Sequence, residues 1–468
     1  MSISGPDIVV AGAGGGLVAA LRAAQLGLDV LIVETSLHYR RGNNTSMSTA
    51  MIPGAGSRWQ KEAGIEDSPG LFVSDVMNKT HGQGDERLAH ALGQVSAWLV
   101  ELLADDIGLP IELVTDFHYP GHSVDRCHTV RGRHGSILLD HLIGQVKLSE
   151  RIDMLMPASL VDVELDTAGA VAAAVVELPD GTRESIQTRH VLMATNGYGA
   201  DRSMVARHMS EIASAVYHGS ESSRGDALRI GTSLGAASAF LDAYQGHAAL
   251  AKRAATLVGW ATVMHGGIMV DLTGRRFGDE TSGYSEYAAA LASRPEAEGW
   301  LIFDKRVHDL CLSFNDFSQT VESGSLVWAE TIESLAEATR LDADALKAEL
   351  ITVTAAAVGQ STDRFGRVAF EAPLAPPYAA VRVVPALFHT QGGLVVDQHA
   401  RVTKPDGAPI TGLYASGGAA AGISGHGAAG YLAGNGLLPA LGLALLAAEH
   451  AARQSGVSSE QQPQKESA

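Results

Sequence analysis

Hydrophobic residues near the amino terminus alternate with glycine turns in a regular order. Residues 8–11 form a short apolar run, a glycine cluster interrupts it, and an Ala/Leu-rich segment with helical spacing continues to about Leu26. After Gly27 a second apolar run follows and ends at Glu34. The glycines of the interruption are Gly12, Gly14, Gly15 and Gly16. This pattern predicts a strand, a glycine turn, a helix and a second strand.

This first stretch has the features of a dinucleotide site. Glycines at the end of a strand let the backbone approach a pyrophosphate, and the N-terminus of the following helix offers free N–H groups. Glu34 falls near the spacing at which an acid binds ribose hydroxyls. The third position of the fingerprint, counted from Gly12, is Leu17, so the loop is one residue short or its register slides within residues 14–16. A glycine-rich turn without a ligand is the alternative.

Further along the chain, the pattern predicts helices and strands of ordinary length. The expected helices cover residues 85–103, 138–148, 330–338, 342–358 and 436–448, and the expected strands cover 171–178, 185–192, 381–384 and 394–397. The order of strand, glycine turn and helix is lost between residues 241 and 379, which indicates an inserted domain. We therefore predict an α/β fold with domain parts at 1–240 and 380–453, the insertion at 241–379 and a disordered tail at 454–468.

The composition limits the classes of partner. A net charge of −18 over 468 residues disfavours nucleic acid and anionic membranes. Two cysteines, Cys127 and Cys311, are too few for a disulfide framework, a cluster or haem attachment, and they fit a cytoplasmic protein. The apolar run 436–448 is too short for a membrane span. No metal is expected, because the histidines beside Cys127 lack zinc spacing; they are His118, His122, His128 and His134.

Six segments, in the same order along the chain, resemble the flavoprotein family of fumarate reductases, succinate dehydrogenases and 3-ketosteroid dehydrogenases. They read GNNTSMSTAM, VLMATNGYGA, SRGDALRIGTSLGAA, MVDLTGRRFGDET, FHTQGG, and GLYASG with GYLAGNGLL. The resemblance covers nearly the whole chain. It implies a two-part Rossmann-like FAD-binding domain with an inserted α+β capping domain, and an active site at the flavin.

The resemblance also implies which residues hold FAD. They are Gly12, Gly14, Gly15, Gly16, Glu34, Thr35 and Val161 around the ADP half, Asn43, Asn44, Thr45 and Ser46 at the flavin ring, Ala194, Thr195 and Gly197 beside the pyrophosphate, and Gly417, Gly418, Asn435, Gly436 and Leu437 at the closing flavin site. Succinate dehydrogenases attach the flavin covalently through a histidine where this chain has Asn44, so we expect noncovalent FAD. Family members often have an acid for ribityl binding where this chain has Gly418, which predicts a lower FAD affinity.

The substrate positions depart from the fumarate-type members. Those members clamp and protonate a dicarboxylate with a histidine and two arginines, and the matching positions here are Phe388, Tyr431 and Tyr284. Two carboxylates are costly to desolvate without such partners. His389 lies one place along from Phe388 and can compensate only in part.

Tyrosine at the proton-transfer position resembles the ketosteroid-type members. This implies Tyr284 as the acid/base, with Tyr431 and His389 as carbonyl donors or substrate contacts. In that chemistry, donors polarise a carbonyl, a tyrosinate removes the acidified α-hydrogen, and hydride leaves the β-carbon for the flavin. A free tyrosine has a pKa of about 10, so a cation or donor must lie nearby, and Arg275, Arg276 and His389 are candidates. A packing role is the alternative for Tyr284, Tyr431 and His389.

Three functions are open at this point. The first is an FAD-dependent oxidoreductase that dehydrogenates or reduces a carbon–carbon bond next to the carbonyl of a ketone, with a separate electron acceptor. The second acts on a small carboxylic acid, like the fumarate reductases and succinate dehydrogenases. The third is a flavin-binding electron-transfer subunit. Arg126, Arg133 and His134 are expected to be solvated surface residues. The alternative, implied by the resemblance because this segment passes near the flavin in the family, is that one of them binds a substrate carboxylate.

Overall fold

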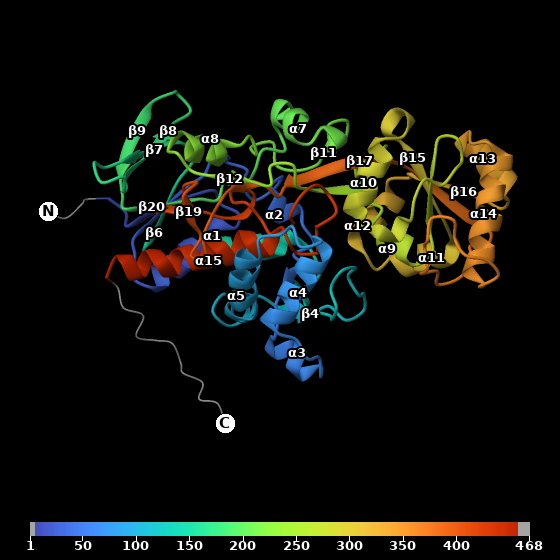
Figure 1. The fold of residues 1–468 in the computed structure, drawn as a ribbon, viewed down its shortest axis with the longest axis horizontal. Helices are drawn as coiled ribbons and strands as arrows, with labels where there is room; N and C mark the ends of the chain where they lie inside the picture. The colour runs from blue at the N-terminus through green and yellow to red at the C-terminus, as the bar shows by residue number, and fades with distance from the viewer. Residues whose placement is uncertain (1–4, 457–468) are drawn as a thin grey trace. The chain divides into compact units, whose positions relative to one another are not determined.

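The computed structural model describes residues 5–456 and divides the chain into two compact units. The first unit comprises Met1–His208, Gly219–Tyr244 and His389–Ala468, and the second comprises Met209–His218 and Gln245–Phe388. Figure 1 follows these stretches from blue to red along the chain. The first unit is therefore assembled from three separate stretches, and the second from two.

A six-stranded sheet forms the centre of the first unit. Its order is β19–β20–β10–β1–β2–β6, and β1 pairs in parallel with both β2 and β10. Only β19 at the edge runs antiparallel to its neighbour. The strands are β1 (Ile8–Ala11), β2 (Val30–Val33), β6 (Ile152–Leu155), β10 (His190–Met193), β19 (Arg401–Thr403) and β20 (Pro409–Ala415). All four residues of β1 are buried, as expected for a strand covered on both faces.

The predicted succession of strand, glycine turn, helix and strand is confirmed. α1 (Gly16–Gln25) follows β1 and packs against α15 (Leu437–Gln454). α15 also packs against α5 (Glu86–Asp105), which explains why the late apolar run is a buried helix. The α/β fold class, with a Rossmann-like sheet built from distant parts of the chain, is confirmed.

Side-chain caps set the starts of the helices around this sheet. Asp85 accepts the N–H of Leu88 at the start of α5, and Ser68 accepts the N–H of Leu71 at the start of α4. The other elements of the first unit are α2 (Asn44–Met47), α3 (Arg58–Glu62), α4 (Pro69–Lys79), α6 (Gly135–Leu148), α7 (Arg202–His208), α8 (Asp226–Ser233), β3 (Ile52–Pro53), β4 (Ile111–Leu113), β5 (Cys127–Val130), β7 (Ser159–Leu165), β8 (Val171–Glu177), β9 (Arg183–Gln187), β12 (Ser238–Ala239), β18 (Gly393–Leu394) and the 3-10 turn η4 (Gly417–Ala419).

The second unit is an α+β structure around one long strand. β17 (Tyr378–Thr390) pairs with β11, β13, β15 and β16, and β15 also pairs with β14. The elements are β11 (Val216–Tyr217), β13 (Tyr244–Ala251), β14 (Ile268–Asp271), β15 (Gly299–Asp304), β16 (Leu326–Ala329), α9 (Ala261–Met264), α10 (Tyr284–Ala292), α11 (Lys305–Cys311), α12 (Asn315–Glu322), α13 (Ile332–Thr339), α14 (Ala343–Ala357) and the 3-10 turns η1 (Ser210–Ile212), η2 (Glu280–Ser282) and η3 (Pro295–Ala297). The helices expected at 330–338 and 342–358 are α13 and α14.

Three expectations about elements need correction. The strand expected at 185–192 is two strands, because β9 ends at Gln187 and β10 begins at His190 in a different sheet. The strand expected at 394–397 is the shorter β18, since Asp397 instead holds a turn by accepting the N–H groups of His399 and Arg401. Gln454, expected in the tail, closes α15, and residues 457–468 of that tail lie outside the described residues.

Residues 5–456 bear on two expectations, about membrane spans and about metal sites. Within this range, none of the helices combines the length and the hydropathy needed to cross a membrane. The same part of the chain contains no group of three or more histidine, cysteine or acidic side chains that could hold a metal ion. Cys127 and Cys311 are both free and buried.

Candidate functional site

The glycine turn between β1 and α1 lies against the end of β10. Gly12 has a φ of 109°, and a Cβ at this position would overlap the carbonyl oxygen of Ala194. A Cβ on Gly14 would lie 3.0 Å from Oγ1 of Thr45. Glycine is therefore required for the chain to pass this closely between its neighbours. The turn brings three expected cofactor residues together, namely Gly12, Gly14 and Ala194.

Gly16 explains the departure from the usual glycine spacing. A Cβ on Gly16 would lie 2.7 Å from Cγ1 of Val10, so this glycine permits the close contact between helix and strand. Gly15 approaches α15 in the same way, because its Cβ would lie 2.8 Å from the carbonyl oxygen of Ala440. Leu17, at the position of the usual third glycine, is a fully buried core residue. The register has therefore moved by one residue.

Glu34 ends β2 with its carboxylate turned toward the glycine turn. Oε2 accepts the N–H of Ala13 at 2.8 Å, and Oε1 accepts the N–H of Ser36 at 2.8 Å. The segment that contains Val161 reaches the same strand end, because Ala158 donates its N–H to the carbonyl oxygen of Glu34. Oγ1 of Thr35 lies 3.3 Å from Oγ of Ser159. The residues expected around the ADP half thus gather at one edge of the sheet, the carboxyl end where such sheets bind ligands.

The polar segment after β2 forms the short helix α2. Asn43 caps it by accepting the N–H of Ser46 at 2.9 Å. Asn44 is held by the backbone of another segment, since its Oδ1 accepts the N–H of Ser220 at 2.8 Å. Thr45 and Ser46 are buried, and Thr45 packs against Gly14 of the glycine turn. The expected flavin-ring segment therefore adjoins the expected pyrophosphate turn.

Three buried polar atoms of the first unit have no hydrogen-bond partner among the described residues. They are Oγ1 of Thr195, Oγ of Ser416 and Oδ1 of Asn435. Thr195 and Ser416 follow the carboxyl ends of the parallel strands β10 and β20. A buried polar atom without a partner costs about 1–3 kcal/mol, so these atoms fit a polar ligand that completes their hydrogen bonds. FAD, with its phosphates, ribityl hydroxyls and polar ring edge, fits this requirement.

Close packing joins the loops after β10 and β20. A Cβ on Gly418 would lie 2.5 Å from Oδ1 of Asn196 and 2.7 Å from the backbone nitrogen of Gly197. A Cβ on Gly417, which has a φ of 58°, would lie 3.2 Å from Cβ of Ala440 in α15. The close packing thus explains why position 418 has glycine and not an acid, because a side chain there would overlap its neighbours.

His389 and Tyr431 meet at the N-terminus of α15. Their ring centroids are 5.9 Å apart, and a Cβ on Gly436 would lie 2.8 Å from Nε2 of His389 and 3.7 Å from the Tyr431 hydroxyl. Leu437 begins α15, whose free N–H groups favour negative charge here. Burial lowers the pKa of His389 to about 4, so its imidazole is neutral at pH 7. Neutral donors, with no fixed positive charge, are grouped at this position.

Tyr284 belongs to the second unit and has aromatic neighbours. It is the first residue of α10, and its ring stacks on His247 of β13 with centroids 5.2 Å apart. Phe388 stacks on His247 at 5.7 Å, and Trp260 meets it edge-on. The hydroxyl of Ser285 accepts the N–H of Gly246 at 2.9 Å, which fixes α10 beside β13.

Sequence reasoning did not single out His247. Burial lowers its pKa to about 3, and its Nδ1 accepts the N–H of Ala249, so the proton of the neutral ring is on Nε2. The only signal in the sequence was one histidine inside an otherwise apolar strand, and it did not show that Tyr284 stacks on the ring.

The arginines suggested as partners for Tyr284 have other surroundings. Arg276 is fully buried and pairs with Glu280 at 2.7 Å and with Asp363 at 2.6 Å, and Arg367 pairs with Glu280 at 3.2 Å. Burial would lower the pKa of Arg276, but these ion pairs raise it. Two arginines and two carboxylates balance in charge, so the cluster braces the turn before α10. Arg275 is exposed.

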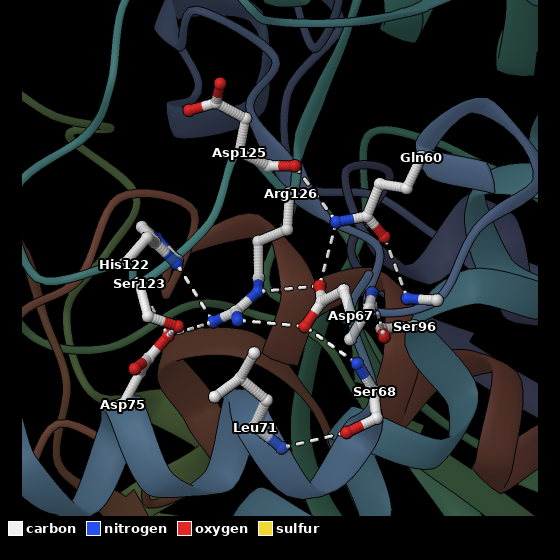
Figure 2. Close-up of polar contacts among 12 residues, drawn as sticks. Gln60, Asp67, Ser68, Leu71, Asp75, Ser96, His122, Ser123, Asp125 and Arg126 are labelled. Atoms are coloured by element: carbon white, nitrogen blue, oxygen red, sulfur yellow. Dashed lines mark hydrogen bonds and ion pairs between the residues drawn. The ribbon is translucent and has the colours of Figure 1, made fainter. Parts of the chain in front are cut away.

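Arg126 is not a surface residue, contrary to expectation. Its side chain is fully buried and bonds both oxygens of Asp67 at 3.0 Å and Asp75 at 2.5 Å, as Figure 2 shows. Arg133 is partly exposed and pairs with Asp116, and His134 caps α6. His122, beside Arg126, lies 3.0 Å from the carbonyl oxygen of Ala433, so the cluster supports the loop before Asn435.

Comparisons with known proteins identify the family and the cofactor. Residues 7–437 match the family described as FAD binding domain, and the chain belongs to that family. It is an FAD-dependent oxidoreductase, and relatives of the chain are named as fumarate reductases.

Among its relatives is the NADH:fumarate oxidoreductase of Klebsiella pneumoniae, 30% identical over 90% of this chain. The chain spans 45% of that relative's length. A fumarate reductase (cytochrome) of Shewanella frigidimarina is 26% identical over 96% of this chain, which spans 77% of that protein.

Solved structures show the same fold. The open conformation of a flavocytochrome c3 fumarate reductase matches 96% of this chain and 78% of its own, with a TM-score of 0.81 and 26% identity. The 3-ketosteroid delta1-dehydrogenase of Sterolibacterium denitrificans matches 96% of this chain and 99% of its own, with a TM-score of 0.77 and 21% identity. At that identity the second likeness concerns the fold alone.

Proposed function

We propose that this oxidoreductase acts on a carbon–carbon bond next to a neutral carbonyl, as in a cyclic ketone, with Tyr284 as the acid/base. The observation that supports this most is the lack of positive charge at the substrate positions. These positions carry Phe388, Tyr431 and Tyr284, and the pKa values of the adjacent His389 and His247 are about 4 and about 3. At pH 7 every one of these histidines is neutral.

A dicarboxylate would be poorly compensated by such groups. Moving an ionised carboxylate out of water is favourable only where a cation or several strong donors replace the water. The buried Arg276 is already balanced by Glu280 and Asp363. A neutral carbonyl needs only hydrogen-bond donors, which tyrosine and neutral histidine supply.

The proposal gives each residue a role. Bound FAD supplies hydride chemistry at the β-carbon. Tyr284, the first residue of α10, exchanges the proton of the α-carbon. The stacked ring of His247 holds the plane of Tyr284. His389 and Tyr431 donate to the carbonyl oxygen and stabilise the charge that develops there.

The names of the relatives favour a second candidate, a reductase of small carboxylic acids. Several of them are fumarate reductases, and one is an NADH:acrylate oxidoreductase of Vibrio harveyi. In this case His389 and Tyr431 would bind a carboxylate without an arginine. We rank this second because the cationic side chains expected for such substrates are replaced.

Anaerobic mixing of the FAD-loaded protein with candidate substrates tests the proposal. We expect the flavin absorbance to be bleached by a saturated cyclic ketone, and the reduced protein to be reoxidised by the corresponding enone. Succinate and fumarate should have no such effect. A response to the carboxylic acids alone would establish the second candidate, and a response to neither class would favour an electron-transfer subunit.

A further inference from the structure

Four side chains of the first unit form a continuous chain of hydrogen bonds. Nδ2 of Asn435 donates to Oγ of Ser424 at 3.1 Å, and Oγ of Ser424 donates to Oε1 of Gln391 at 2.9 Å. Nε2 of Gln391 lies 2.9 Å from Nδ1 of His389. Ser424 and Asn435 are each 1% exposed and Gln391 is 5% exposed, so water does not compete within the chain.

This series of hydrogen bonds has a direction, because its two inner side chains, Ser424 and Gln391, each accept one hydrogen bond and donate another. The hydroxyl of Ser424 has one proton, so if it accepts from Asn435 it must donate to Gln391. Gln391 then presents its NH2 group to His389, and Nδ1 of His389 must be the acceptor. The proton of the neutral imidazole is consequently on Nε2.

The two side chains at the ends of this hydrogen-bond series, Asn435 and His389, are both residues expected to serve the reaction. Oδ1 of Asn435 is buried without a partner among the described residues. At the other end, Nε2 of His389 lies beside Gly436 and the Tyr431 ring. Reversing the chain would turn the free atom of Asn435 into a donor and Nε2 of His389 into an acceptor.

We propose that Gln391, Ser424 and Asn435 are positioning residues that fix His389 as the Nε2–H tautomer. The atom that Asn435 offers to the cofactor and the atom that His389 offers to the substrate are thereby set together. The use of this N–H on a carbonyl rests on the proposed function, whereas the tautomer itself does not.

Local packing leaves room for the side chain of Gln391. A Cβ on Gly422 would lie 3.2 Å from Oε1 of Gln391, so glycine leaves room for this amide. One contact opposes the Nε2–H tautomer, because the carbonyl oxygen of Thr390 lies 3.3 Å from Nδ1 of His389 and would favour a proton there. The amide of Gln391 is closer at 2.9 Å and decides the tautomer.

Nitrogen NMR of the FAD-loaded protein with 15N-labelled histidine measures the tautomer directly. We expect wild-type His389, assigned through its loss in His389→Asn, to carry its proton on Nε2. In Gln391→Glu the new carboxylate accepts from the ring, so Nδ1 becomes protonated. Ser424→Ala releases Gln391 to rotate, so the Nε2–H form loses its exclusive population, and FAD binds about fivefold more weakly because Asn435 is no longer held.

Ser96→Ala is the matched control, since Ser96 is equally buried and its hydroxyl bonds only backbone groups, those of Ala55 and Gly93. The His389 signal of this variant should equal that of the wild type. A change of tautomer in Ser96→Ala would contradict the proposed role of Gln391, Ser424 and Asn435. An Nδ1–H tautomer in the wild type would overturn the proposal, as would an unchanged Nε2–H signal in Ser424→Ala. Ser424→Ala alone decides the matter if Gln391→Glu does not fold.

The NMR result is independent of substrate turnover. If the tautomers are as expected but the protein does not respond to cyclic ketones, the positioning role of Gln391, Ser424 and Asn435 is supported and only the proposed function is contradicted. Turnover of a ketone with an Nδ1–H tautomer would do the reverse.

Discussion

At the scale of single residues, the candidate chemistry depends on a few polar groups in nonpolar surroundings. Tyr284 is placed by its stacking on His247 and by its position at the start of α10. His247 and His389 are kept neutral by burial, which lowers the pKa of each well below its usual value. The proposed function depends on these neutral histidines and on the phenol of Tyr284.

Tyr284→Phe should lower turnover of a ketone substrate by about 10²-fold or more while FAD stays bound, because only the proton-transferring hydroxyl is removed. Steady-state rates with an artificial electron acceptor measure the effect. Tyr287→Phe is the control: it removes a hydroxyl from the same helix, and that hydroxyl makes only a long contact of 3.4 Å to Gly278. Equal activity of Tyr284→Phe and the wild type would remove Tyr284 from the mechanism.

Asn44 should leave the flavin unattached. An amide is not a nucleophile, and Oδ1 of Asn44 is already engaged by the N–H of Ser220. After acid precipitation we expect all FAD in the supernatant, measured by its absorbance. A yellow pellet that keeps its colour after washing would show a covalent bond.

At the scale of elements, glycine positions decide how closely the strands and helices approach one another. The turn after β1 passes the end of β10 at Gly12, and α1 meets the sheet at Gly16. These contacts leave the backbone of the turn bare at the carboxyl edge of the parallel strands, where a pyrophosphate can approach.

Gly12→Ala should abolish tight FAD binding, because the new Cβ would push the turn away from Ala194 and a positive φ strains alanine. Titration with FAD by flavin fluorescence measures the loss. Gly64→Ala is the matched control, since Gly64 also has a positive φ, of 71°, but has open space around it. Equal FAD affinity in the two variants would contradict the placement of the turn.

At the scale of the whole molecule, both units bury histidines in neutral form. Burial lowers the pKa to about 4 for His122, His128, His190, His389 and His450 and to about 3 for His247. Below a pH of about 6.5 these histidines bind protons in the unfolded chain but stay unprotonated in the folded chain. The stabilisation from these groups is therefore complete above that pH and is lost as the pH falls toward 4.

The FAD-loaded protein should accordingly lose stability steeply between pH 6.5 and pH 4. Each such histidine adds up to about 1.4 kcal/mol per pH unit to the slope. Urea unfolding at several pH values, with saturating FAD, measures it. His128→Asn should flatten the slope, and the exposed His81→Gln should not. A stability independent of pH over this range would contradict the neutral, buried state of these histidines.

The sequence alone predicted the Rossmann-like core and its cofactor because those features are local. A buried parallel strand needs a continuous apolar run, a helix needs its spacing, and a close turn needs glycine, so residues 8–34 and α13 and α14 could be identified from patterns. The split of 185–192 into β9 and β10 was missed, because it depends on which sheet each residue joins and not on its neighbours in sequence.

The surroundings of the charged and aromatic side chains could not be predicted from local patterns. The sequence around Arg126 is that of an ordinary surface arginine. In the structure Arg126 is buried and pairs with Asp67 and Asp75, which are distant in sequence. The stacking of His247 on Tyr284, and the link from Asn435 through Ser424 and Gln391 to His389, likewise join separate segments. The sequence by itself determined the fold class and the flavin. Only the tertiary structure decided burial, protonation state and hydrogen-bond direction, because these depend on neighbours that no local pattern records.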